Sequence, residues 1–171
     1  RFYSNNKSSL PVSIMGSKST KPINYFEYRG SAQCKSSVML AALNTPGETT
    51  IKAKKSRDHT ELLFKHLKVP IKIKKTKKFD FIKVEGIKKI LPLRYKVPAD
   101  ISSTAFFIVL TALSKNSTLL IKNVNINPSR IGVITILKKM GIKIFFRNKK
   151  NYKGEMVADI FVKTSKKLNS I

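Results

Sequence analysis

Residues 30–36, GSAQCKS, lead directly into the apolar residues 38–43, VMLAAL. This pattern predicts a helix from Ser31 to about Leu43, ended by the turn sequence NTPG at 44–47. The first backbone N–H groups of a helix have no partner within it and carry partial positive charge. Together with a serine hydroxyl they suit a phosphate or a carboxylate. The same residues also fit an ordinary N-cap, so the stretch alone leaves both interpretations open.

Strand and helix patterns alternate along the rest of the chain. A second helix is expected to begin at Ser56 as its cap, with Leu62, Leu63 and Leu67 buried. A third is expected over 100–113. A fourth is expected from Asn127-Pro128 to Gly141, with Ile131, Ile134 and Leu137 facing inward. Strands are expected at 10–16, 23–28, 49–53, 69–74, 79–84, 91–97, 117–124, 142–146 and 157–163.

These elements repeat with a period of about 70 residues. Each unit reads helix, strand, helix, strand, strand, so residue 31 corresponds to 101–102 and residue 51 to 121. Each unit would expose two apolar helix stripes, and we therefore expect several units to pack their helices inside and their sheets outside. The units divide the chain into a first domain at 1–97 and a second at 98–171, with a hinge near 97–100.

Composition limits the classes of protein that the chain can represent. Its 171 residues are 42% hydrophobic, enough for one ordinary domain or two small ones. No apolar stretch approaches the roughly 18 residues of a membrane span, and no leader is visible, so we expect no membrane partner. Cys34 is the only cysteine, which excludes an internal disulfide and a cysteine-based metal site and fits the cytoplasm. The ends of the chain suggest a segment of a longer protein.

The formal net charge of +26 has three explanations. Lysine rises together with isoleucine and asparagine in A+T-rich genomes, and here the excess is nearly all lysine spread over every segment. A nucleic-acid partner would also favour it, but the chain has no arginine-rich helix, zinc spacing or RNA-recognition strand, so we expect no nucleic acid. A positive field that steers small anions toward a cleft is the third explanation.

Five motifs carry a resemblance to a known family. They are residues 31–36 (SAQCKS), 43–47 (LNTPG), 56–61 (SRDHTE), 98–106 (PADISSTAF) and 127–130 (NPSR). In this order and spacing they resemble the enolpyruvyl transferases, specifically the 5-enolpyruvylshikimate-3-phosphate synthases in the branch that tolerates glyphosate. The resemblance implies an α/β (α+β) fold, an inside-out α/β barrel of repeated βαβαββ units, three in each of two domains. The chain would hold the third unit of the first domain and the first unit of the second.

The resemblance also implies an activity. The family transfers the enolpyruvyl group of phosphoenolpyruvate to the 5-hydroxyl of shikimate 3-phosphate and releases phosphate, with no metal and no cofactor. The implied partners are these two substrates and the remainder of the same enzyme chain, in a cytoplasmic monomer. No catalytic residue is expected within this chain. A preceding segment would supply a Lys-Ser site and a Gly-rich loop, and a following segment the catalytic Asp, Glu, Lys and Arg residues.

The resemblance assigns four substrate-binding residues. Ser31 would bind the phosphate of shikimate 3-phosphate, Ala32 would contribute its backbone, and Gln33 would reach toward both substrates. Arg57 would contact the phosphate or the ring side, since its guanidinium can bridge two oxygens at once.

Other residues in these motifs have plainer interpretations. Lys35 and Arg130 are expected to be structural. Asp100, Ser102 and Ser103 are expected to cap the helix that follows, and Cys34 to be a small core residue. His59 and His66 share a helix face but lack a third metal ligand. Residues 72–78 read as a solvated hairpin. Ala99 stands where the family usually has glycine, which would strain the hinge if that position needs a positive φ.

Three alternatives remain beside this assignment. The enolpyruvyl transferases that act on UDP-N-acetylglucosamine share the fold but not the SAQ and SRDHTE motifs. A basic nucleic-acid-binding module and a regulatory segment without catalysis are the other two.

Overall fold

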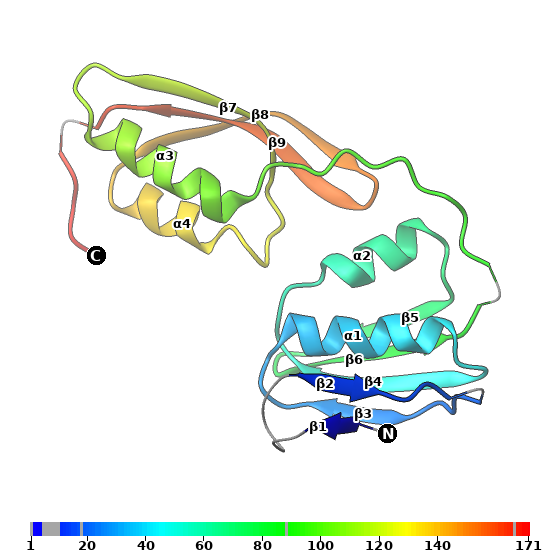
Figure 1. Ribbon diagram of the computed structural model, residues 1–171. Helices are drawn as coiled ribbons and strands as arrows, with labels where there is room; N and C mark the ends of the chain where they lie inside the picture. The colour runs from blue at the N-terminus through cyan, green and yellow to red at the C-terminus, as the bar shows by residue number, and fades with distance from the viewer. Residues whose placement is uncertain (1, 5–10, 18, 88, 166) are drawn as a thin grey trace.

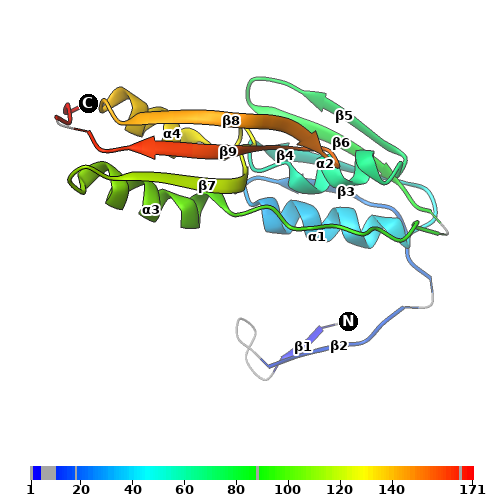
Figure 2. The same cartoon turned by 90° about the horizontal axis from the view of Figure 1, so that it is seen from above.

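The computed structural model describes residues 2–4, 11–17, 19–87, 89–165 and 167–171. The chain forms two halves, each with a sheet that is covered by helices on one face (Figures 1 and 2). The first half contains β3 (Asn24–Glu27), α1 (Ala32–Leu43), β4 (Glu48–Lys54), α2 (His59–His66), β5 (Ile71–Lys75) and β6 (Phe79–Glu85). The second contains α3 (Ile101–Leu113), β7 (Thr118–Asn125), α4 (Gly132–Lys139), β8 (Lys143–Tyr152) and β9 (Glu155–Lys163). Strands β1 (Phe2–Ser4) and β2 (Val12–Ile14) pair separately.

The two halves have the same topology. The strand order is β4-β6-β5 in the first sheet and β7-β9-β8 in the second, with antiparallel pairing throughout. In the first half β3 adds a parallel neighbour to β4. The second half has only a single parallel bridge at this place, between Ala99 and Val124. The repeat inferred from spacing is therefore confirmed in the order and direction of the strands.

Each half has its own core, produced by the alternation of side chains along the strands. In β4, Ile51 and Ala53 are buried whereas Lys52 and Lys54 are exposed. The core of the first half consists mainly of Met39, Ala42, Leu43, Ile51, Ala53, Phe64, Ile82 and Val84. That of the second half includes Ile101, Ile108, Val124, Ile134, Leu137, Ile144, Ile160 and Val162. The division of the chain at 97–100 remains a prediction, which these two cores support.

Helix α3 carries a second apolar face that points away from its own sheet. Phe106 is 78% exposed, and its neighbours on this face are Phe107, Leu110 and Leu113. Contiguous exposed apolar surface on a helix usually marks an interaction site. This face agrees with the expectation that the helices pack against further units, which remains a prediction.

Two helices begin later than the sequence predicts. Helix α2 starts at His59 with Asp58 as its N-cap, so the assignment of Ser56 as the cap is wrong. Its buried residues are Glu61 and Phe64, whereas the leucines expected there are only half-buried. Helix α4 starts at Gly132, because residues 128–131 form a turn. Its buried residues include Ile134 and Leu137, as expected, and it ends before Gly141, whose φ is +93°.

Several smaller expectations also change. Residues 91–97 form no strand; they run as an extended connection along the outside of the molecule (Figure 1), and Leu91 and Val97 are exposed. Cys34 is exposed rather than part of the core. The strand expected at 10–16 is the shorter β2, and Leu10 lies outside the described residues. Strand β8 extends to Tyr152, well beyond the expected end at 146.

The connection between the halves is not strained at Ala99. Its φ lies outside the positive region, and its N–H donates to the carbonyl of Asn123 at 2.9 Å. The departure from glycine therefore has no backbone cost at this position.

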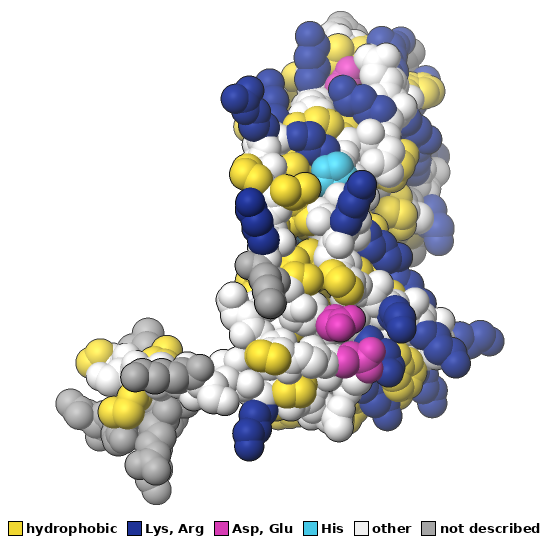
Figure 3. All heavy atoms as spheres, turned by 90° about the vertical axis from the view of Figure 1, so that its right-hand side faces the viewer, with side chains coloured by type: hydrophobic (Ala, Val, Ile, Leu, Met, Phe, Trp, Pro, Cys, Tyr) yellow, Lys and Arg dark blue, Asp and Glu magenta, His cyan; other side chains and the backbone are white. Residues whose placement is uncertain are grey.

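The surface charge is dispersed. Lys and Arg side chains are scattered over both halves of the face shown in Figure 3 and do not form one patch. None of the described helices is long and apolar enough to cross a bilayer.

Candidate functional site

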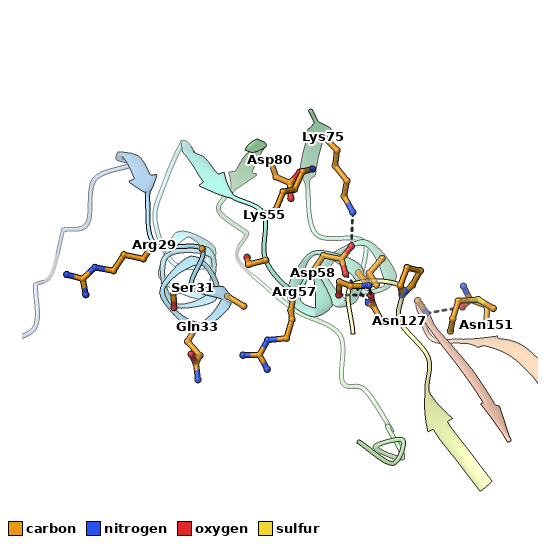
Figure 4. Close-up of a pocket in the computed structure, with 18 residues that line it drawn as sticks. Arg29, Ser31, Gln33, Lys55, Arg57, Asp58, Lys75, Asp80, Asn127 and Asn151 are labelled. Atoms are coloured by element: carbon orange, nitrogen blue, oxygen red, sulfur yellow. Dashed lines mark hydrogen bonds and ion pairs between the residues drawn. The ribbon is translucent and has the colours of Figure 1, made fainter. Parts of the chain in front are cut away.

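A cleft of about 1040 Å³ lies between the two halves (Figure 4). The first half contributes the start of α1 and the loop after β4. The second contributes the turn at 127–129 and the end of the β8–β9 hairpin. Ser31, Ala32, Gln33 and Arg57, the four residues expected to bind substrate, all line this cleft. The structure therefore brings them together, while their roles as ligands of a substrate remain a prediction.

A tight turn positions the start of α1. The buried carboxylate of Glu27, at the end of β3, accepts from the backbone N–H of Arg29 at 2.9 Å and of Gly30 at 2.7 Å. Gly30 has a φ of +76°, a conformation that glycine adopts without the usual cost of a Cβ. Glu27 was not singled out from the sequence, since its carboxylate acts on backbone groups that no local motif specifies.

Ser31 is the N-cap of α1. Its Oγ accepts from the N–H of Cys34 at 3.2 Å, and its carbonyl accepts from the N–H of Lys35 at 3.1 Å. The ordinary N-cap interpretation is thus confirmed, but it does not exclude a ligand, because the hydroxyl proton remains available for donation. The N–H groups of Ala32 and Gln33 precede the first intrahelical bonds and lie at the open end of the helix. This end of α1 can therefore donate several hydrogen bonds to an anion in the cleft.

Arg57 lies on the loop between β4 and α2. Its side chain is exposed and extends to the same side of the start of α1 as Gln33 (Figure 4). Arg29 also lines the cleft but points away from both. The carbonyl of Arg57 accepts from Nζ of Lys35 at 2.8 Å. Lys35 is fully buried and pairs with Glu61 at 2.5 Å, so its expected structural role is confirmed.

Ser56 has an unexpected environment. It lines the cleft, and its Oγ is buried without a hydrogen-bond partner among the described residues. A buried hydroxyl that lacks a hydrogen-bond partner lowers the stability of the fold. Ser56 lies on the loop that borders the cleft. The sequence motif contains Ser56, but only the later start of α2 shows that its hydroxyl is free of a capping role.

Two further cations on the cleft are neutralised by carboxylates. Nζ of Lys75 on β5 lies 2.7 Å from Oδ2 of Asp58, and Lys55 forms an ion pair with Asp80. Burial acts to raise the pKa of Asp58, but the hydrogen bonds from Lys75 and Asn127 outweigh it and hold the pKa below its ordinary value. The sequence did not indicate these pairs, because Lys75 lies on β5 and Asp80 on β6. Only the folding of these two strands brings them to the cleft beside Asp58 and Lys55.

A polar cluster joins the two halves at one side of the cleft. Nδ2 of Asn127 donates to Oδ1 of Asp58 at 2.9 Å and to Oε2 of Glu155 at 3.3 Å. Nδ2 of Asn125 donates to the same Glu155 oxygen at 3.1 Å, and His59 contacts its other oxygen. The expectation that Asn127 begins a helix is wrong. Instead its Oδ1 accepts from the N–H of Ser129 at 2.8 Å and shapes the turn that lines the cleft.

The residues after the hinge behave as expected. Asp100 caps α3 by accepting from the N–H of Ser102 at 3.1 Å. Nη2 of Arg130 donates to Oδ1 of Asp100 at 2.7 Å and to Oγ of Ser102 at 2.6 Å. Arg130 is therefore structural, and it fixes the turn at 127–130 to the start of α3.

Comparison with known proteins gives a consistent result. A family model described as EPSP synthase (3-phosphoshikimate 1-carboxyvinyltransferase) matches residues 2–169. A 3-phosphoshikimate 1-carboxyvinyltransferase of Petrotoga mobilis is 44% identical over 168 residues, which is 96% of this chain and 38% of that protein. The protein of the same name from Caldicellulosiruptor bescii is 42% identical over 91% of this chain and 36% of its own length. The solved EPSP synthase of Acinetobacter baumannii superposes with a TM-score of 0.84 at 36% identity, covering all of this chain and 38% of that one.

The chain thus spans a little over a third of the length of these relatives. The match extends over both halves and over all the motifs that border the cleft. Its fold is the α/β fold of the solved relative. The chain belongs to the EPSP synthase (3-phosphoshikimate 1-carboxyvinyltransferase) family.

Proposed function

We propose that this chain forms the shikimate 3-phosphate-binding part of an enzyme of chorismate biosynthesis. That enzyme transfers the enolpyruvyl group of phosphoenolpyruvate to the 5-hydroxyl of shikimate 3-phosphate and releases phosphate. One observation carries the proposal: Ser31, Ala32, Gln33 and Arg57 border the same cleft between the two halves.

The charge distribution in the cleft supports a phosphorylated ligand. Lys55 and Lys75 are paired with carboxylates, whereas the guanidinium of Arg57 forms no ion pair with any described residue. A guanidinium beside helix N–H groups is a suitable site for a phosphate. Ser56 lines the same wall of the cleft.

The catalytic groups are proposed to lie outside this chain. The reaction needs a proton donor, a base and a clamp for phosphoenolpyruvate, and the family resemblance assigns all three to other segments of a longer enzyme. The chain would then act together with that remainder, as part of a cytoplasmic monomer. Measurable enolpyruvyl transfer by the 171-residue chain alone would contradict this assignment.

Titration calorimetry with shikimate 3-phosphate tests the proposal, with the variants made in the full-length enzyme to which the chain is proposed to belong. Gln33→Ala removes an exposed side chain, so it is expected to weaken binding by about tenfold while the fold survives. Ser31→Ala is expected to weaken binding as well, and also to lower stability by about 1 kcal/mol through loss of the cap. Ser37→Ala is the matched control, because its hydroxyl bonds the carbonyl of Cys34 on the same helix and Ser37 does not line the cleft.

The same measurement separates the alternatives. Unchanged binding in both cleft variants would count against the proposal. Binding of UDP-N-acetylglucosamine in place of shikimate 3-phosphate would assign the chain to the other enolpyruvyl transferases. Steep, salt-dependent binding of DNA that is insensitive to Gln33→Ala would favour a nucleic-acid-binding module.

A further inference from the structure

We propose that Lys35 is a positioning residue, whose buried ammonium group fixes the peptide of Arg57 and so places the Arg57 guanidinium beside the start of α1. The inference rests on the proposed function, because it gives Lys35 a role in building the phosphate site. It goes beyond the expectation that Lys35 is merely structural.

The geometry places Lys35 directly behind the cleft. Lys35 follows Ser31 by one helical turn, and side chains on a helix lean toward its N-terminus. Its ammonium group therefore lies near the first turn of α1, which carries Ser31 and Gln33. From there Nζ donates to the carbonyl of Arg57 at 2.8 Å and pairs with Oε1 of Glu61 at 2.5 Å. One buried group thus joins the two segments that border the proposed phosphate site.

A purely stabilising role explains this arrangement poorly. A buried ion pair has to overcome the desolvation of both charges, and apolar side chains of similar volume often stabilise a fold equally well. A cation near the start of a helix is also opposed by the helix dipole, and the first turn of α1 contains no acidic residue. The second oxygen of Glu61 is buried and has no hydrogen-bond partner among the described residues. The pair is therefore costly for stability alone.

The hydrogen bond to the carbonyl of Arg57 gives Lys35 a role other than stabilising the fold. The carbonyl of Arg57 belongs to the peptide that joins residues 57 and 58. A donor that holds this peptide plane therefore also restrains the Cα of Arg57, from which the side chain extends. Ser36 and Thr60 also join α1 to α2, through hydroxyl groups 2.6 Å apart. That contact is made inside α2, whereas the contact of Lys35 is made on Arg57 itself.

A double variant separates positioning from stability. Lys35→Met alone would leave the Glu61 carboxylate buried without its counter-ion, so loss of folding there would carry no information. Lys35→Met combined with Glu61→Leu removes both charges and keeps most of the buried volume. It also removes the donor to the Arg57 carbonyl. Ser36→Ala is the matched control, because it cuts the other contact between α1 and α2 and leaves Lys35 in place.

Two measurements are made. Backbone NMR relaxation of the amides at 56–59 in the 171-residue chain reports the order of the loop without any ligand. Calorimetry on the full-length enzyme to which the chain is proposed to belong reports the affinity for shikimate 3-phosphate. In the double variant we expect the order parameters at 56–59 to fall from about 0.85 to about 0.6 or below and the Kd to rise about tenfold, with the urea midpoint near that of the parent. Ser36→Ala is expected to leave the order parameters near those of the parent and to change the Kd by less than about twofold.

The outcomes are distinguishable. Unchanged order parameters at 56–59 in a folded double variant would overturn the positioning role, whatever the affinity. A full-length parent enzyme that binds no shikimate 3-phosphate would count against the proposed function, and the relaxation measurement would still decide the role of Lys35. If the double variant does not fold, Glu61→Gln replaces it, because this variant keeps the bond to Arg57 and is predicted to leave the order parameters at 56–59 near those of the parent. A fall to about 0.6 or below there would assign the order of the loop to the ion pair and overturn the inference.

Discussion

Nδ1 of His59 lies 2.5 Å from Oε1 of Glu155, and this contact joins α2 of the first half to β9 of the second. The other carboxylate oxygen of Glu155 accepts from Asn125 and Asn127. The residue before His59, Asp58, bonds Asn127 as well. The loop that carries Arg57 is therefore joined to the second half by Asp58 and His59, the two residues that follow Arg57.

Glu155 should make stability depend on pH at the acid end. Burial acts to raise its pKa, but the contacts with His59, Asn125 and Asn127 outweigh burial and hold the pKa below its ordinary value of 4.5. A group whose pKa is lowered by folding contributes stability above its unfolded pKa and loses it as the pH falls through the folded-state value. This contribution is thus complete at neutral pH and disappears below 4.5.

Glu155→Gln tests this linkage in urea unfolding experiments. At neutral pH the variant should be less stable than the parent by about 1 kcal/mol, allowing for solvent screening through the partly exposed side chain of His59. The difference should shrink as the pH is lowered. Glu48→Gln is the control, because its pair with Lys83 is exposed on both sides. A constant difference between parent and Glu155→Gln at all pH values would refute the linkage.

Gly154 sits where the β8–β9 turn meets α2. Its φ is +91°, and a Cβ at this position would lie 2.9 Å from the carbonyl oxygen of Leu62. Gly154→Ala should therefore destabilise the chain by about 1–3 kcal/mol and push the turn away from α2. Gly132→Ala is the control, because a Cβ there meets nothing within 4 Å and alanine favours the helix. Equal unfolding midpoints for the two variants would show that the turn moves freely.

Local patterns predicted the elements that depend on local chemistry. The cap at Ser31, the cap at Asp100 and the end of α4 at Gly141 follow from residues within a turn of each other, and all are confirmed. The repeat could be read from spacing because both halves place their helices and strands in the same order. Residues 91–97 have an apolar alternation that resembles a strand, but a strand also needs a neighbour with which to pair.

The cleft could be predicted only in part. The family resemblance that the motifs carry assigned Ser31, Ala32, Gln33 and Arg57 to one site, and the structure places all four on one cleft. The contacts that position the residues of the cleft join segments far apart in the sequence, so local sequence patterns do not predict them. Asn127 bonds Asp58 across 69 residues, and this bond replaces the helix cap that its Asn-Pro sequence suggests. Burial of Lys35 likewise depends on Glu61, which lies on another helix.

The two cores predict two units of unfolding. Ile82 in the first half and Ile160 in the second are both almost fully buried, so truncation of either to alanine should cost about 2–5 kcal/mol. If the halves are separate domains at 1–97 and 98–171, each substitution should lower mainly the transition of its own half. Hydrogen exchange in urea, resolved by residue, makes the comparison. Equal loss of protection in both halves from either variant would show one cooperative unit and contradict the division.

The exposed face of α3 should make the 171-residue chain associate with itself. Phe106 and Leu110 lie on this face, and apolar surface of this kind is buried when another copy or another unit covers it. Phe106→Gln combined with Leu110→Gln keeps good helix formers while it removes the apolar side chains. Sedimentation velocity over a range of concentrations should show less association in this variant, with the unfolding midpoint nearly unchanged.

The control for this prediction is Leu120→Gln. Leu120 is also exposed, but it lies on β7 and not on the helix face. If association depends on α3, the control should sediment like the parent. Equal association in the parent and the α3 variant would show that this helix face does not mediate contacts between copies, and would remove the main structural support for its packing against further units.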